Sequence, residues 1–132
     1  MEKNKLRSIL ERVKTIAVVG ASSNPSRDSF KVTKFLIEKG YEVYPINPNE
    51  TNNNILGRKF LSNLNEIGKK INLVDIFRAK KFVMDITKDS IEIGVDVIWT
   101  QEGIKDKKSA YIAKKAGIIF VMDECPKKVL EN

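Results

Sequence analysis

Residues 15–48 read TIAVVGASSNPSRDSFKVTKFLIEKGYEVYPINP, and this stretch decides the fold. Thr15–Val19 is a short, continuous apolar run, which is typical of a strand buried on both faces of a parallel sheet. After a polar loop, apolar residues return at helical spacing until the Lys-Gly pair at 39–40, a usual helix end. Tyr41–Ile46 predicts a second strand, so the stretch indicates a strand–helix–strand unit.

The predicted helix of this unit has one apolar face and a polar start. The residues on that face are Phe30, Thr33, Leu36 and Ile37. Ser26 and Asp28 both belong to residue types that cap helices, so we expect one of them to cap the N-terminus.

The same alternation continues to the end of the chain. Further strands are predicted over residues 73–77, 95–99 and 118–122, with helices over about 79–93 and 107–116 and a leading helix over about 6–13. Alternating strands and helices indicate right-handed crossovers in a parallel sheet. We therefore expect a single α/β domain spanning residues 1–132. Its expected architecture is a Rossmann-like, doubly wound three-layer sandwich with a five-stranded parallel sheet in the order 3-2-1-4-5.

The composition excludes several classes of chemistry. The chain has no histidine and one cysteine, which excludes histidine-based acid–base catalysis, a disulfide framework and structural zinc. The charged N-terminus lacks the apolar stretch of a signal peptide, and no apolar run approaches the ~20 residues that span a bilayer. We expect a cytoplasmic protein with no membrane partner.

The formal charge of +7 comes from 24 basic and 17 acidic residues. An anionic partner explains it, and so does the Lys-, Ile- and Asn-rich composition of an AT-rich genome. The lysine pairs are dispersed along the chain and no basic face is interleaved with aromatic residues, which disfavours nucleic acid as the partner.

Ligands of such folds bind beyond the carboxyl ends of the strands. The first strand is followed by Gly20 and small residues before a helix, which favours a phosphate site, with close helix packing as the alternative. The loop has neither the G-x-G-x-x-G pattern nor a Walker ending. After the second strand stands Asn47 in place of the carboxylate that grips the NAD ribose, which disfavours a classical NAD protein.

Six motifs occur in order: GAS…R at 20–27, GYEVYPINP at 40–48, LGRK at 56–59, VDIFR at 74–78, VIWTQEG at 97–103 and D-x-C at 123–125. By these motifs the chain resembles the small, single-domain CoA-binding proteins of bacteria and archaea. They are similar to the CoA-binding domain of the succinyl-CoA synthetase α subunit. The resemblance implies a protein that holds coenzyme A or an acyl-CoA without catalysis of its own. The alternatives are a subunit or relic of an acyl-CoA synthetase-type enzyme, or an NAD(P)-binding Rossmann protein. A homo-oligomer or another protein partner stays open.

The resemblance also implies where the ligand lies. Gly20, Ala21, Ser22 and Arg27, with Ser23 in the same loop, would hold the diphosphate. Asn47 and Pro48 would line the adenosine end. Arg78, Trp99 and Gln101 would border the pantetheine path. The alternative for Trp99 is a place in the core, and for Arg78 it is pairing with Asp75 or with a helix C-terminus. Arg58 and Lys59 are the candidates for a 3′-phosphate.

Overall fold

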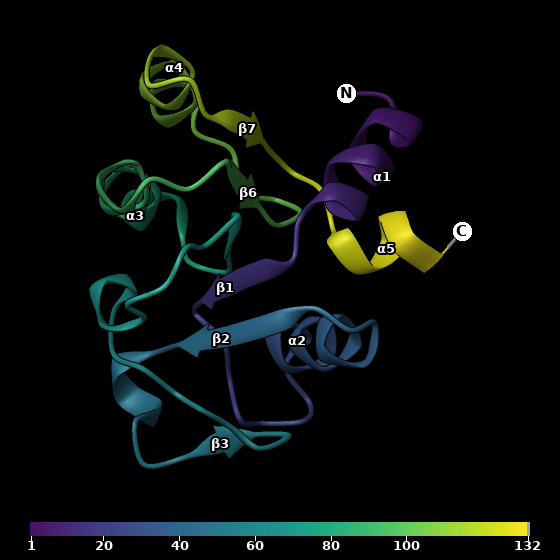
Figure 1. Cartoon of the computed structure of the whole chain (residues 1–132), viewed down its shortest axis with the longest axis vertical. Helices are drawn as coiled ribbons and strands as arrows, with labels where there is room; N and C mark the ends of the chain where they lie inside the picture. Colours follow the sequence, from purple (N-terminus) through teal and green to yellow (C-terminus); the bar gives the residue numbers. More distant parts are fainter. Residues whose placement is uncertain (132) are drawn as a thin grey trace.

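The computed structural model describes residues 1–131 and shows a five-stranded parallel sheet in the order β2-β1-β5-β6-β7 (Figure 1). Its strands are β1 (Thr15–Val19), β2 (Glu42–Ile46), β5 (Leu73–Ile76), β6 (Val97–Thr100) and β7 (Ile119–Val121). The helices are α1 (Lys3–Arg12), α2 (Asp28–Glu38), α3 (Lys80–Ile93), α4 (Lys107–Lys115) and α5 (Pro126–Glu131). Between β2 and β5 lie two short 3₁₀ helices, η1 (Pro48–Glu50) and η2 (Leu64–Glu66), and a small hairpin of β3 (Asn54–Ile55) and β4 (Arg58–Lys59). The expected α/β sandwich is confirmed.

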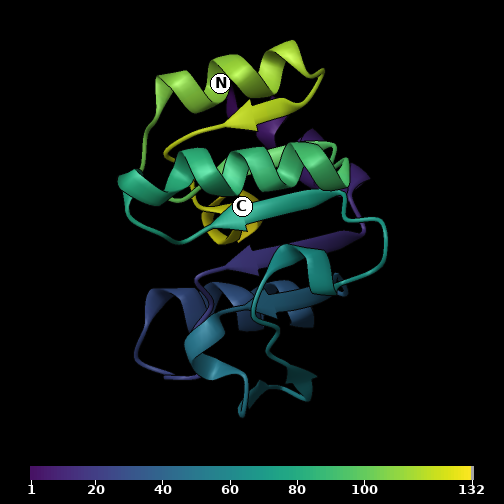
Figure 2. The same ribbon diagram turned by 90° about the vertical axis from the view of Figure 1, so that its left-hand side faces the viewer.

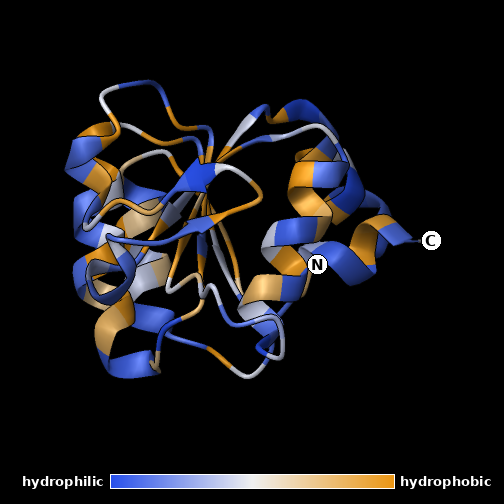
Figure 3. Ribbon diagram, turned by 90° about the horizontal axis from the view of Figure 1, so that it is seen from below, coloured by the Kyte–Doolittle hydropathy of each residue, from blue (hydrophilic) through white to orange (hydrophobic). Residues whose placement is uncertain are grey.

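Helices cover both faces of the sheet. α1, α2 and α5 lie on one face, and α3 and α4 lie side by side on the other (Figures 1 and 2). Successive strand residues point to opposite faces, so Val18 packs toward α1, α2 and α5 while its neighbours Ala17 and Val19 pack toward α3 and α4. Along the helices that flank the sheet, hydrophobic segments alternate with hydrophilic ones (Figure 3), as expected for helices with one apolar face.

The expected strand order was wrong. Numbered among the five long strands, the order is 2-1-3-4-5, with β5 beside β1. The outer edge of β2 is already covered by the chain after the hairpin, because Leu61 donates its N–H to the Pro45 carbonyl (3.0 Å) and accepts one from Asn47 (2.8 Å). With that edge taken, the fully buried β5 pairs with β1 on the inner side.

The expected helix cap was also wrong. The N-cap of α2 is Arg27, with no side-chain capping hydrogen bond. Ser26 turns away because both its N–H (3.0 Å) and its hydroxyl (2.8 Å) donate to the side-chain oxygen of Asn24. The 3₁₀ helix η1, the hairpin β3–β4 and the short helix α5 were not predicted, while the other helices and strands lie within a few residues of their expected bounds.

No helix among the described residues has the length and apolar character needed to cross a membrane.

Candidate functional site

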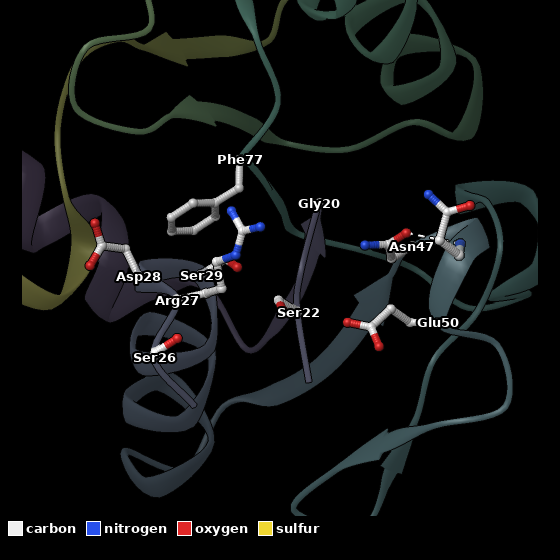
Figure 4. Close-up of a pocket in the computed structure, with 10 residues that line it drawn as sticks. Gly20, Ser22, Ser26, Arg27, Asp28, Ser29, Asn47, Glu50 and Phe77 are labelled. Atoms are coloured by element: carbon white, nitrogen blue, oxygen red, sulfur yellow. Dashed lines mark hydrogen bonds between the residues drawn. The ribbon is translucent and has the colours of Figure 1, made fainter. Parts of the chain in front are cut away.

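A cavity of about 620 Å³ opens at the carboxyl ends of β1 and β2 (Figure 4). It is lined by Gly20 and Ser22 after β1, by Ser26, Arg27, Asp28 and Ser29 at the start of α2, by Asn47, Asn49 and Glu50 after β2, and by Phe77 after β5. The first loop and the second strand end therefore meet at one site, as their positions in the sequence predicted.

The N-terminus of α2 is the feature of this cavity best suited to an anion. A helix leaves its first N–H groups without intrahelical partners, and they carry a partial positive charge. Because no side chain caps α2, these groups stay available beside the cavity. Arg27 is exposed, and its guanidinium points toward Phe77 (Figure 4). Asp28 is the acidic residue of this first helical turn. The arrangement suits a phosphate or diphosphate group, although the negative charge of Asp28 would partly repel it.

Glu50 is a residue of the site that the sequence analysis missed. Its carboxylate accepts the N–H of Ser23 (2.6 Å), the hydroxyl of Ser23 (2.6 Å) and the amide of Asn53 (2.8 Å). The hydroxyl of Ser23 and then its N–H hold the pKa of Glu50 below its ordinary value. The carboxylate reaches the loop after β1 because η1 turns the chain back toward it. The only sequence signal was an acidic residue three positions beyond Asn47.

Asn47, directly after β2, connects the end of this strand to the loop after β1. Its amide nitrogen donates to the carbonyl of Ala21 (2.9 Å), and its side-chain oxygen accepts the N–H of Asn49 (2.9 Å). Ala21 itself is fully buried. Pro48 is exposed as the first residue of η1.

A second cavity, of about 500 Å³, continues from the first, and Phe77 and Asp28 line both. Its apolar wall includes Val32 and Ile104. Gln101 also faces it, and so does the buried thiol of Cys125. Besides Asp28, the charged residues that line it are Lys31, Arg78, Glu102, Lys127, Lys128 and Glu131. The two cavities together offer a polar compartment followed by a more apolar one.

Arg78 is stacked on an aromatic ring, and Trp99 does not border a path for pantetheine. The Arg78 guanidinium stacks on the Phe82 ring, 4.1 Å from its centre. Trp99 is fully buried and its indole N–H donates to the Glu124 carbonyl (2.9 Å). Trp99 is therefore a core residue, and it lines neither of these cavities.

The candidates for a 3′-phosphate lie outside both cavities. Arg58 is exposed on β4 and donates to the carbonyl of Leu56 (2.9 Å). Lys59 lines a separate hollow with Thr51 and Gly57.

The family model described as "CoA binding domain" matches residues 14–131, nearly the whole chain. The chain belongs to the CoA-binding domain family. The resemblance drawn from the six motifs is thereby confirmed.

Relatives of this CoA-binding domain occur both alone and inside larger proteins. YneT of Bacillus subtilis (strain 168) is 36% identical over 125 residues, 95% of this chain and 91% of YneT. The α subunit of ADP-forming acetate–CoA ligase I of Pyrococcus furiosus is 35% identical over 89 residues, 64% of this chain but 19% of that subunit. A solved structure of a hypothetical protein from Pyrococcus horikoshii OT3 has a TM-score of 0.93 at 37% identity, covering 99% of this chain and 91% of that one.

The ten predicted residues of the CoA-binding domain fall into three groups. Gly20, Ser22, Arg27 and Asn47 line the first cavity, and Arg78 and Gln101 line the second. Ala21, Ser23, Pro48 and Trp99 line neither. Since Ser23 is engaged by Glu50, the candidate donors for a phosphate are Ser22 and the groups at the start of α2.

Proposed function

We propose that the chain binds coenzyme A, free or acylated, across the two joined cavities and carries out no chemistry of its own. The observation that carries this proposal is the uncapped N-terminus of α2 beside Arg27, inside the 620 Å³ cavity. A diphosphate placed there receives backbone N–H groups, the helix dipole and one guanidinium.

The second cavity supports a ligand that extends beyond its phosphate groups. It begins where Phe77 and Asp28 end the first cavity, and it is more apolar in its wall. A nucleotide whose diphosphate carries a long, mostly uncharged arm matches this sequence of compartments. Pantetheine is such an arm. The cytoplasm, where a free cysteine stays reduced, is the compartment we propose.

A second candidate function is a role beside a catalytic subunit. The ligase α subunit of Pyrococcus furiosus contains a region similar to this chain within a much longer polypeptide. On that proposal the chain presents CoA to another protein, which must supply the catalytic residues. Co-purification of a stable partner would favour it, and a free monomer or homo-oligomer would favour the first proposal.

Native mass spectrometry of the purified chain tests the ligand class. The expected result is a bound mass equal to CoA or a CoA thioester, or an adduct of that mass after CoA is added. A chain that takes up NAD(P) and not CoA would contradict the proposal.

A further inference from the structure

A carboxyl group lies where burial is most costly, in the middle of the sheet. Asp75 belongs to β5, opposite Val18 of β1 and Trp99 of β6, and it is fully buried. Removal of a carboxyl group from water costs free energy unless it is paired, and burial raises the pKa of Asp75 well above its ordinary value. Packing alone does not explain an acid here, because an apolar side chain would fill the same space at lower cost.

The partner of Asp75 is the side chain of Gln101. With its amide NH₂ turned toward Asp75, Gln101 donates to both carboxyl oxygens, at 3.0 and 3.1 Å. Either protonation state of Asp75 offers this NH₂ an acceptor oxygen. The backbone of Gln101 is fixed as well, since its N–H donates to the Ile76 carbonyl (3.2 Å). An ionised Asp75 can only accept hydrogen bonds, so in this form it selects the orientation of the Gln101 amide in which the NH₂ faces it.

Gln101 stands between this buried acid and the second cavity. It follows β6 directly, its exposed fraction is 6%, and it lines the cavity together with Phe77 and Cys125. With the NH₂ group held by Asp75, the amide oxygen of Gln101 is the group left to accept a hydrogen bond. That oxygen is complementary to the N–H of a secondary amide.

We propose that Asp75 is a positioning residue that holds the Gln101 amide so that its oxygen binds an amide N–H in the arm of the ligand. The class of ligand is a nucleotide diphosphate with an amide-containing arm. This inference rests on the proposed function, because it assigns a residue that binds the arm of the same ligand.

The test compares two ligands on the full chain, CoA and adenosine 3′,5′-bisphosphate, which lacks both the arm and the second phosphate of the CoA diphosphate. Four variants are titrated beside the wild type by calorimetry: Gln101→Met, Asp75→Val, Asp75→Asn and the double variant Asp75→Val/Gln101→Met. Methionine keeps the length of glutamine without its amide, and valine fills a buried strand position without an acceptor. Asparagine offers both an acceptor oxygen and an NH₂ donor, so it can meet either orientation of the Gln101 amide.

Gln101→Met and Asp75→Val are each expected to weaken CoA about tenfold, the value of one hydrogen bond, while the bisphosphate changes less than about twofold. The double variant should be no weaker than Gln101→Met, because Asp75 acts through Gln101. The CoA affinity of Asp75→Asn should lie between those of the wild type and Asp75→Val, because asparagine still bonds Gln101 but no longer selects one orientation of its amide. If Asp75→Val does not fold, Asp75→Ala takes its place in the cycle.

Three results would overturn the inference alone: equal loss of both ligands, unchanged CoA affinity in Gln101→Met, or an Asp75→Val effect that persists in full beside Gln101→Met. Failure of the proposed function looks different. In that case the wild type binds neither ligand, and both proposals fall.

Discussion

Gly20 packs so closely on Phe77 that a Cβ added to Gly20 would lie 2.4 Å from the Phe77 carbonyl oxygen. Its φ of +93° is also one that residues with a side chain rarely adopt. This contact joins the end of β1 to the end of β5, and Phe77 lines both cavities. The glycine therefore sets how the loop after β1 meets the wall that the two compartments share.

Gly20→Ala is expected to lower the free energy of unfolding by roughly 2 kcal/mol or more and to weaken CoA binding, because both the positive φ and the contact with Phe77 are violated. Gly57→Ala is the matched control. Gly57 has a φ of +83° but no atom within 4 Å of an added Cβ, so it should lose only about 1 kcal/mol. Urea unfolding of both variants measures the difference, and equal losses would refute the role of the contact.

Arg27→Ala is expected to weaken CoA about ten- to a hundredfold, since a charge-assisted hydrogen bond contributes roughly 1.5–3 kcal/mol. The fold should be unchanged, because Arg27 is exposed at the mouth of the cavity. Arg12→Ala serves as the control, because Arg12 donates to Ser8 within α1 and lines neither cavity. A loss of less than twofold in Arg27→Ala would leave the phosphate to the backbone N–H groups alone.

Glu50→Gln is expected to destabilise the chain at neutral pH but not in acid. The folded pKa of Glu50 is lowered, mainly by the Ser23 hydroxyl, so its ionised form stabilises the fold above its unfolded pKa of about 4.3. This stabilisation is lost as the pH falls through the folded pKa. Unfolding at pH 7 and at successively lower pH should show the gap between wild type and variant closing. Ser23→Ala keeps the N–H donor to Glu50. Its loss of unfolding free energy relative to the wild type at pH 7 should therefore be smaller than that of Glu50→Gln.

Asp75→Asn is expected to gain stability relative to the wild type as the pH rises. Burial raises the folded pKa of Asp75 above its unfolded value of about 3.9, so between these two values the native state holds a proton that the unfolded chain has lost. Wild-type stability at this site therefore falls as the pH rises through that window, and asparagine removes the effect. A difference in unfolding free energy that stays constant from pH 3 to pH 7 would contradict the assignment.

The sequence predicted the elements well where the signal was local. Continuous apolar runs such as Thr15–Val19 identify buried strands, and Gly94 and Gly117 follow the ends of α3 and α4 with positive φ. The loop after β1 was placed at the ligand rim because its position follows from the topology of any such sheet.

What could not be predicted depends on contacts between distant residues. The edge of β2 is taken by Leu61, which no local pattern reveals, and this placed β5 beside β1. Glu50 reaches Ser23 only after η1 turns the chain, and Asn24 draws Ser26 away from the helix it was expected to cap. The last two contacts engage side chains of the loop after β1 that could otherwise serve a phosphate.

The most direct test of the central claim is a calorimetric titration of the wild-type chain with CoA and with NAD under the same buffer and salt. Both ligands carry a diphosphate for the N-terminus of α2. Glu50, the carboxylate three residues beyond Asn47, is already held by Ser23 and Asn53 and so is not free to grip the NAD ribose. CoA alone has the pantetheine arm for the second cavity. We expect CoA to bind at least about tenfold more tightly than NAD, the value of about one further hydrogen bond. Equal affinities would contradict the account and indicate a general dinucleotide-binding protein.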